Sequence, residues 1–274
     1  MFKLSHNVIA HAELKHQHYV INQNRHSILW IMLALSMIIP GVLLSLVALV
    51  LAALDLDAGR WALLASPTWA MAVSVGGLSL LVMNLALYVV VMLTALALAY
   101  NSITRERQNN TWDILMLTNV DAALLVRGKW WACLRAMWGD YLLLLLLRVG
   151  MACVLIVGVD SVRGGVGLVA LIALIITAFT LVDVGFTIAL AIASGVTDVS
   201  ANVSGPVMLA VRLVAILIAG GAYGLMLFFI VIDQINVMIL LGICVIGVYG
   251  IITWLTLSAA RRLAIRRGLL PSRR

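Results

Sequence analysis

Long uncharged apolar runs constrain this chain more than any other feature of its sequence. The runs 28–54, 71–100 and 237–260 contain no charged residue. A helix that crosses the hydrocarbon core of a bilayer, about 30 Å thick, needs roughly 20 apolar residues. Each run exceeds that length, and a buried helix of a soluble protein needs no such stretch. The runs therefore predict transmembrane helices.

Further apolar runs carry a few charged residues each. They are 130–159 with Arg135, Asp140 and Arg148, 166–193 with Asp183, and 206–232 with Arg212. With 64% hydrophobic and 11% charged residues, the chain also has too little polar surface to cover a soluble globule. We therefore predict an all-α integral membrane protein with about six transmembrane helices in a single membrane domain, residues 28–260.

The distribution of lysine and arginine predicts the orientation of the chain. An even number of spans places both termini on one side, and only Arg60 and Arg163 then fall on the other side. The cationic residues on the shared side are Lys3, Lys15, Arg25, Arg105, Arg107, Arg127, Lys129, Arg261, Arg262, Arg266, Arg267, Arg273 and Arg274. Short cytoplasmic loops retain an excess of such residues, so we expect both termini in the cytoplasm and the protein in a plasma or inner membrane.

The net charge of +7 follows from this topology, and we therefore expect no nucleic-acid partner. The basic cytoplasmic tail 261–274 suits anionic lipid headgroups instead.

The N-terminal segment 1–27 is polar and lacks the apolar core and cleavage site of a secretory signal, so we expect the first span to be retained. An interfacial helix is predicted there. The histidines of the chain are His6, His11, His16, His18 and His26. No two of them are four residues apart, and no cysteine or carboxylate cluster completes a set of ligands, so we expect no metal site.

The polar segment 102–129, between the second and third predicted spans, is the most informative part of the chain for function. Residues 105–110 leave the membrane at the cytoplasmic face, and Trp112 and Leu115 then follow beside Asp113. Asp113 is favourable near the positive N-terminus of a short helix. Thr118 and Asp121 introduce a second helical run that leads into the third span. Apolar side chains displayed outside the bilayer suggest insertion into another protein.

At these residues the chain resembles the permease subunits of type-2 ABC exporters. The residues that carry the resemblance stand in the order and spacing typical of that family: Arg105, Glu106, Arg107, Thr111, Trp112, Asp113, Leu115, Leu117, Thr118, Gly128 and Lys129. Asn7 and residues 13–15 also look like the family's pre-membrane segment. The resemblance implies that segment 102–129 contains a coupling helix that docks on a separate cytoplasmic ATP-binding cassette ATPase. It also implies a second permease half, a homodimer or a related chain, because six spans are half of the usual twelve.

The chain departs from the family pattern at three places. Asn110 replaces a glycine, Asn119 replaces a proline, and only residues 233–236 connect the last two spans, where many members carry re-entrant outer helices. The last departure suits an alternative function, a permease-like scaffold subunit of a larger complex that does not transport. The segment 102–129 can also be read as an ordinary loop resting on the membrane surface.

The chain contains no GxxxxGK[ST] phosphate-binding loop. It is therefore not expected to be an enzyme or to hold a cofactor, and ATP and magnesium are expected on the partner ATPase.

Polar residues inside the spans are the remaining candidates, because an unpaired charge at the bilayer centre costs at least about 2.5 kcal/mol. The deep ones are Asn84, Asp140, Arg148 and Asp183. They either line a substrate path, or Arg148 pairs with one carboxylate and locks spans three and four together. Arg135 and Arg212 are expected near enough to the inner face to extend their charged ends to water.

Overall fold

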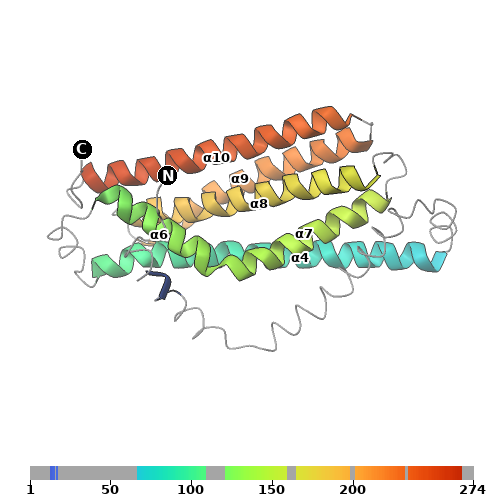
Figure 1. Cartoon of the computed structure of the whole chain (residues 1–274). Helices are drawn as coiled ribbons and strands as arrows, with labels where there is room; N and C mark the ends of the chain where they lie inside the picture. Colours follow the sequence, from blue (N-terminus) through green and yellow to red (C-terminus); the bar gives the residue numbers. More distant parts are fainter. Residues whose placement is uncertain are drawn as a thin grey trace.

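The computed structural model describes residues 13–15, 17, 67–108, 121–158, 165–197, 201–231 and 234–266. In these residues the chain forms helices and no strand. The long helices are α4 (Pro67–Gln108), α6 (Ala122–Ala136), α7 (Trp138–Gly158), α8 (Gly165–Val196), α9 (Ala201–Val231) and α10 (Ile235–Arg266). They run side by side along one direction, so the molecule is an elongated bundle (Figure 1).

Successive helices of the bundle run in opposite directions, except that α7 continues in the general direction of α6, and α8 lies among all the others (Figure 1). It contacts α4, α6, α7, α9 and α10. Helices α4 and α10 end, and α6 and α9 begin, at one end of the bundle, which we call the base (Figure 1). At the far end, α7 leads to α8, and α9 leads to α10.

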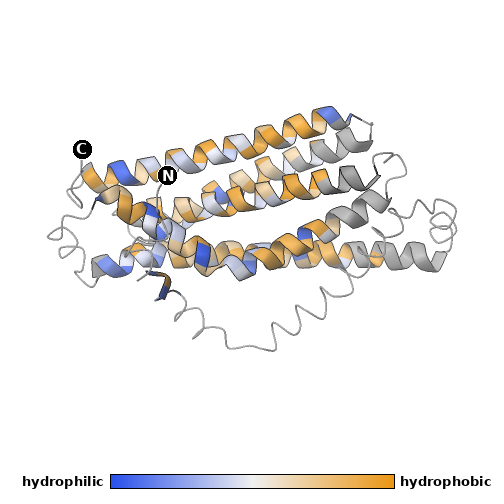
Figure 2. Ribbon diagram, in the orientation of Figure 1, coloured by the Kyte–Doolittle hydropathy of each residue, from blue (hydrophilic) through white to orange (hydrophobic). Residues whose placement is uncertain are grey.

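Four of the described helices are long and apolar enough to cross a membrane. The apolar segments are Leu78–Glu106, Leu171–Val196, Ser204–Ala222 and Asn236–Ile265. Large apolar side chains on their outer surfaces, such as Leu85, Leu217 and Leu240, are exposed and suit contact with lipid. Figure 2 shows that apolar residues predominate along α8, α9 and α10. The described chain is thus an all-α membrane protein, whereas the run 28–54 lies outside the described residues, and six spans stay a prediction.

The third predicted span differs from the structure because it is not one unbroken helix. The chain bends at Met137, whose φ of −95° and ψ of 9° separate α6 from α7. The predicted helical run at Asp121 is confirmed, since the Asp121 carboxylate caps α6 by accepting a hydrogen bond of 3.1 Å from the amide of Ala123. Helix α6 crosses the bundle obliquely near the base, from α10 toward α4, and α7 continues beside α4 (Figure 1).

The apolar core is densest in the half of the bundle nearer the base. Ala99 and Ile103 of α4 pack there with Ile188 and Ile192 of α8, and all four side chains are fully buried. Close approach of the two helices depends on Gly195, because a Cβ atom at that position would lie 3.0 Å from the Cβ of Ile103. Gly195 therefore fixes a close spacing between α4 and α8 near the base.

Candidate functional site

A group of charged residues at the base, which we call the base ion cluster, consists of Glu13, Arg105, Glu106 and Lys129. The Lys129 side chain is completely buried, and its Nζ lies 2.8 Å from Oε1 of Glu106 and 3.4 Å from Oε2 of Glu13. It also donates a hydrogen bond of 2.7 Å to the carbonyl of Ser102. Arg105 Nη2 reaches the same Oε2 of Glu13 at 3.4 Å. Three segments of the chain therefore share one set of ion pairs.

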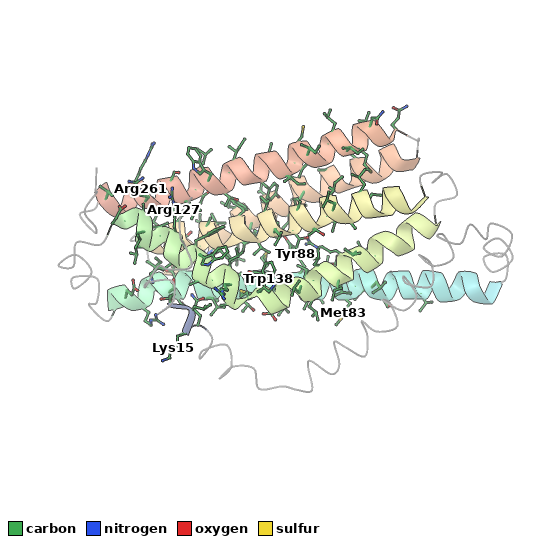
Figure 3. The ribbon with its side chains drawn as sticks, viewed as in Figure 1. Lys15, Met83, Tyr88, Arg127, Trp138 and Arg261 are labelled. Carbon is green, nitrogen blue, oxygen red and sulfur yellow. The ribbon has the colours of Figure 1, made fainter. Side chains whose placement is uncertain are left out.

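Gln17 attaches the N-terminal segment to α6 beside this cluster. Its Nε2 lies 2.9 Å from Sγ of Cys133 and donates to Oε1 of Glu13 at 3.2 Å. Both Gln17 and Cys133 are buried. The segment that contains Glu13 and Gln17 is consequently packed against α6, and Lys15 of the same segment lies at the outside of the bundle near the base (Figure 3).

The structure brings three of the predicted coupling residues together. Arg105 and Glu106 lie in the last turns of α4, Lys129 lies in the middle of α6, and the pair Lys129–Glu106 joins the two helices that flank residues 109–120. The Arg107 side chain and all of residues 109–120 lie outside what the structure describes. These include the predicted coupling residues Thr111, Trp112, Asp113, Leu115 and Leu117.

A second polar group, which we call the central polar cluster, lies halfway along the bundle around Tyr88, which is labelled in Figure 3. Arg212 of α9 and Asp183 of α8 form an ion pair in which Nη2 lies 2.6 Å from Oδ1. The same Nη2 donates to the Tyr88 hydroxyl oxygen at 2.6 Å, and the Tyr88 hydroxyl donates to Oδ2 of Asp183 at 3.1 Å. Helices α4, α8 and α9 are thus joined by a closed polar triangle.

Arg148 of α7 completes the central polar cluster. Its Nη1 donates a hydrogen bond of 2.7 Å to the Thr180 hydroxyl of α8, and its guanidinium lies 5.0 Å from the centre of the Tyr88 ring. The guanidinium of Arg212 lies 5.8 Å from the same ring and 5.7 Å from the ring of Phe186. Aromatic faces at these distances stabilise cations, most strongly where water is excluded.

The cluster corrects two expectations for the intramembrane charges. The arginine that pairs with Asp183 is Arg212, not Arg148, so the ion pair joins α8 to α9. The expected reach of Arg212 to the inner face is wrong, because its side chain is only 1% exposed. The physical reason is depth: α9 begins at Ala201, which places Arg212 about 16 Å along the helix at 1.5 Å per residue.

The other deep candidates, Asn84 and Asp140, lie on the same helices as Tyr88 and Arg148 at different distances from the cluster. Asn84 is one turn before Tyr88 on the same face of α4, and its Oδ1 is buried with no hydrogen-bond partner in the described part of the chain. Asp140 lies in the first turn of α7, eight residues before Arg148. Sequence reasoning missed Tyr88 and Thr180, for which the only signal was their position within a turn of Asn84 and Asp183.

Comparison with known protein families, with curated proteins and with solved structures gives no match. The fold and the two clusters therefore define the class: an all-α membrane protein with ion pairs both at its base and in the middle of its helical bundle.

Proposed function

We propose that this chain is the membrane-spanning permease subunit of an ABC-type exporter. A separate cytoplasmic ATPase would hydrolyse ATP, and this chain would couple that hydrolysis to movement of a substrate across the membrane. The base ion cluster carries the proposal. It unites Arg105, Glu106 and Lys129, which flank the predicted coupling helix, with Glu13 of the segment that resembles the family's pre-membrane segment.

The burial of Lys129 supports coupling over an ordinary surface loop. Removing an ammonium group from water is expensive unless nearby carboxylates and other acceptors compensate. Glu13, Glu106 and the Ser102 carbonyl supply that compensation here. A loop that rests on the membrane surface needs no such pair, since a lysine near the headgroups can extend its amine into water. A firm connection between α4 and α6 suits a segment through which force passes from a partner into the bundle.

The proposal includes six spans, of which the run 28–54 and the α6–α7 segment supply two. It also includes cytoplasmic termini, a plasma or inner membrane, contact of the tail 261–274 with lipid, and a second permease half. Lys15, Arg127 and Arg261 lie toward the base in Figure 3, and their common side supports a cytoplasmic base.

Copurification tests the proposed coupling. The full chain, purified from its own membranes, should bring down an ATP-hydrolysing subunit. Replacing Trp112 and Leu115 by alanine should weaken that association about tenfold or more, because buried apolar anchors dominate such interfaces. Trp254→Ala is the matched control, since Trp254 is 62% exposed on α10. Equal recovery of the ATPase with both variants would overturn the docking role of segment 102–129.

One observation favours the alternative, a permease-like scaffold that does not transport. Helix α9 ends at Val231 and α10 begins at Ile235, so little chain is left at the far end for re-entrant helices. Spin labels on the exposed positions Leu174 and Leu240, in a background without native cysteines, separate the two functions. A permease should change this distance when ATP is added to the complex with its ATPase, whereas a scaffold should keep it constant.

A further inference from the structure

We propose that the central polar cluster binds an oxyanion, a carboxylate or phosphate group, between Arg148 and Arg212. This binding site goes beyond the proposed function, because an anion can bind here whether or not an ATPase drives the chain. Four observations carry the proposal. The cluster has more positive than negative charge, and Arg212 has hydrogen-bond donors without a partner among the described residues. Arg148 bonds a neutral hydroxyl, and one side of the cluster is less buried than the other.

The first observation is an excess of positive charge. The central polar cluster holds the guanidinium groups of Arg148 and Arg212 but only the carboxylate of Asp183. Asp140 is eight residues from Arg148 on the same helix, which corresponds to about 12 Å along the axis. An excess cation in a low-dielectric interior is unfavourable, and one bound anion would neutralise it.

The second observation is that Arg212 keeps unused hydrogen-bond donors although it is buried. Its Nη2 serves both Asp183 and Tyr88, while Nε and Nη1 have no partner among the described residues. Buried donors are almost always satisfied, so two such donors on one side chain require an explanation. Arginine presents its donors in a planar fork that matches the two oxygens of a carboxylate or phosphate.

The third observation concerns Arg148, whose hydrogen-bond acceptor in the cluster is a neutral hydroxyl. Thr180 accepts from Arg148 at 2.7 Å and uses its own hydrogen for the carbonyl of Ile176, also at 2.7 Å. The Tyr88 ring stabilises the cation through its face but supplies no negative charge. The positive charge of Arg148 is therefore not compensated by a carboxylate within the central polar cluster.

The fourth observation is the direction from which a ligand can approach. Asp183 and Arg212 are enclosed, whereas Tyr88 and Arg148 are only half-buried. The open side of the cluster therefore faces the α4–α7 side of the bundle. An oxyanion arriving from that side meets the half-buried guanidinium of Arg148 first. The group can belong to the headgroup of an anionic lipid or to a free ion, and the experiment distinguishes these sources.

The test measures thermal unfolding of the full chain, purified in a neutral detergent without any ATPase, by tryptophan fluorescence. One arm adds potassium phosphate in place of potassium chloride at constant ionic strength. The other adds phosphatidylglycerol or phosphatidylcholine to the micelles. We expect a saturable rise in melting temperature with at least one of phosphate and phosphatidylglycerol. A rise with phosphate assigns the site to free oxyanions, and a rise with phosphatidylglycerol alone assigns it to a lipid headgroup.

The variant Arg148→Gln is decisive because it removes the excess charge and leaves the Asp183–Arg212 pair in place. It should fold, and its affinity for the stabilising anion should fall about tenfold or more, as expected for loss of a charged hydrogen bond. Arg148→Lys should recover part of that affinity. Arg135→Gln, which removes an exposed charge from α6, should bind like the unaltered chain. The absence of any saturable rise, or equal affinity in Arg148→Gln and Arg135→Gln, would overturn the proposal.

Discussion

Replacing Arg212 by methionine should destabilise this protein more than any change of an exposed arginine. Methionine preserves much of the length of the side chain but removes the 2.6 Å contacts of Nη2 with Asp183 and with Tyr88. The Asp183 carboxyl group then stays buried, with the Tyr88 hydroxyl at 3.1 Å as its partner. Removing one partner of a buried ion pair typically costs about 3–5 kcal/mol, because the other charge is left without compensation.

Companion variants show how much of this loss of stability comes from the ion pair and how much from the Tyr88 hydroxyl. Asp183→Asn should be destabilising for the same reason, since it leaves Arg212 charged and enclosed. The double variant Arg212→Met with Asp183→Asn carries neither charge and should recover about 2 kcal/mol relative to the sum of the single changes. Tyr88→Phe removes a hydroxyl that serves both ions and should cost about 1.5–3 kcal/mol.

The free energy of unfolding is measured by titrating the protein from mild detergent into sodium dodecyl sulfate and following tryptophan fluorescence. Arg135→Met is the matched control, because Arg135 is exposed at the end of α6. The reasoning is refuted if Arg212→Met costs no more than Arg135→Met. Strictly additive losses in the double variant would likewise show that the two charges do not stabilise each other.

Two further predictions concern topology and helix packing. A cysteine placed at Arg60 should react with an impermeant thiol reagent from outside intact cells, and one at Asn109 only after permeabilisation; the reverse labelling would refute the cytoplasmic base. Gly195→Ala should cost about 1–3 kcal/mol by overpacking, since its Cβ would lie 3.0 Å from that of Ile103. Adding Ile103→Gly, which removes that Cβ atom, should make Gly195→Ala less harmful than it is alone, and an equal loss in both backgrounds would contradict the contact.

The long helices were predictable because few backbone structures other than a helix are stable inside a lipid bilayer. Runs such as 71–100 and 237–260 contain no charge, and an apolar segment of that length satisfies its backbone in lipid only as a helix. The start of α6 was predictable for a local reason, since the Asp121 carboxylate can bond an amide two residues on. Both predictions depend only on residues close together in the chain.

The partners of buried charges could not be predicted in the same way. Depth counted from the start of an apolar run placed Arg212 near the surface, although α9 begins several residues earlier and carries it into the bundle. Its partner Asp183 is on another helix, and the rotation of α8 and α9 about their axes decides whether the two meet. Lys129 is a comparable case, because one of its partners, Glu13, lies 116 residues away along the chain.

Helix α4 links the two clusters and supplies a physical basis for the proposed coupling. Arg105 and Glu106 are held in the base ion cluster, while Tyr88, 17 residues earlier and about 25 Å along the same helix, bonds both ions of the central polar cluster. A helix transmits a tilt at one end to the other, because its backbone bonds leave few ways to bend without a kink. Movement of the segment 102–129 by a partner would therefore shift Tyr88 relative to the pair on α8 and α9. The Tyr88 hydroxyl contacts measure 2.6 and 3.1 Å. A displacement of about 1 Å would lengthen both beyond hydrogen-bonding distance.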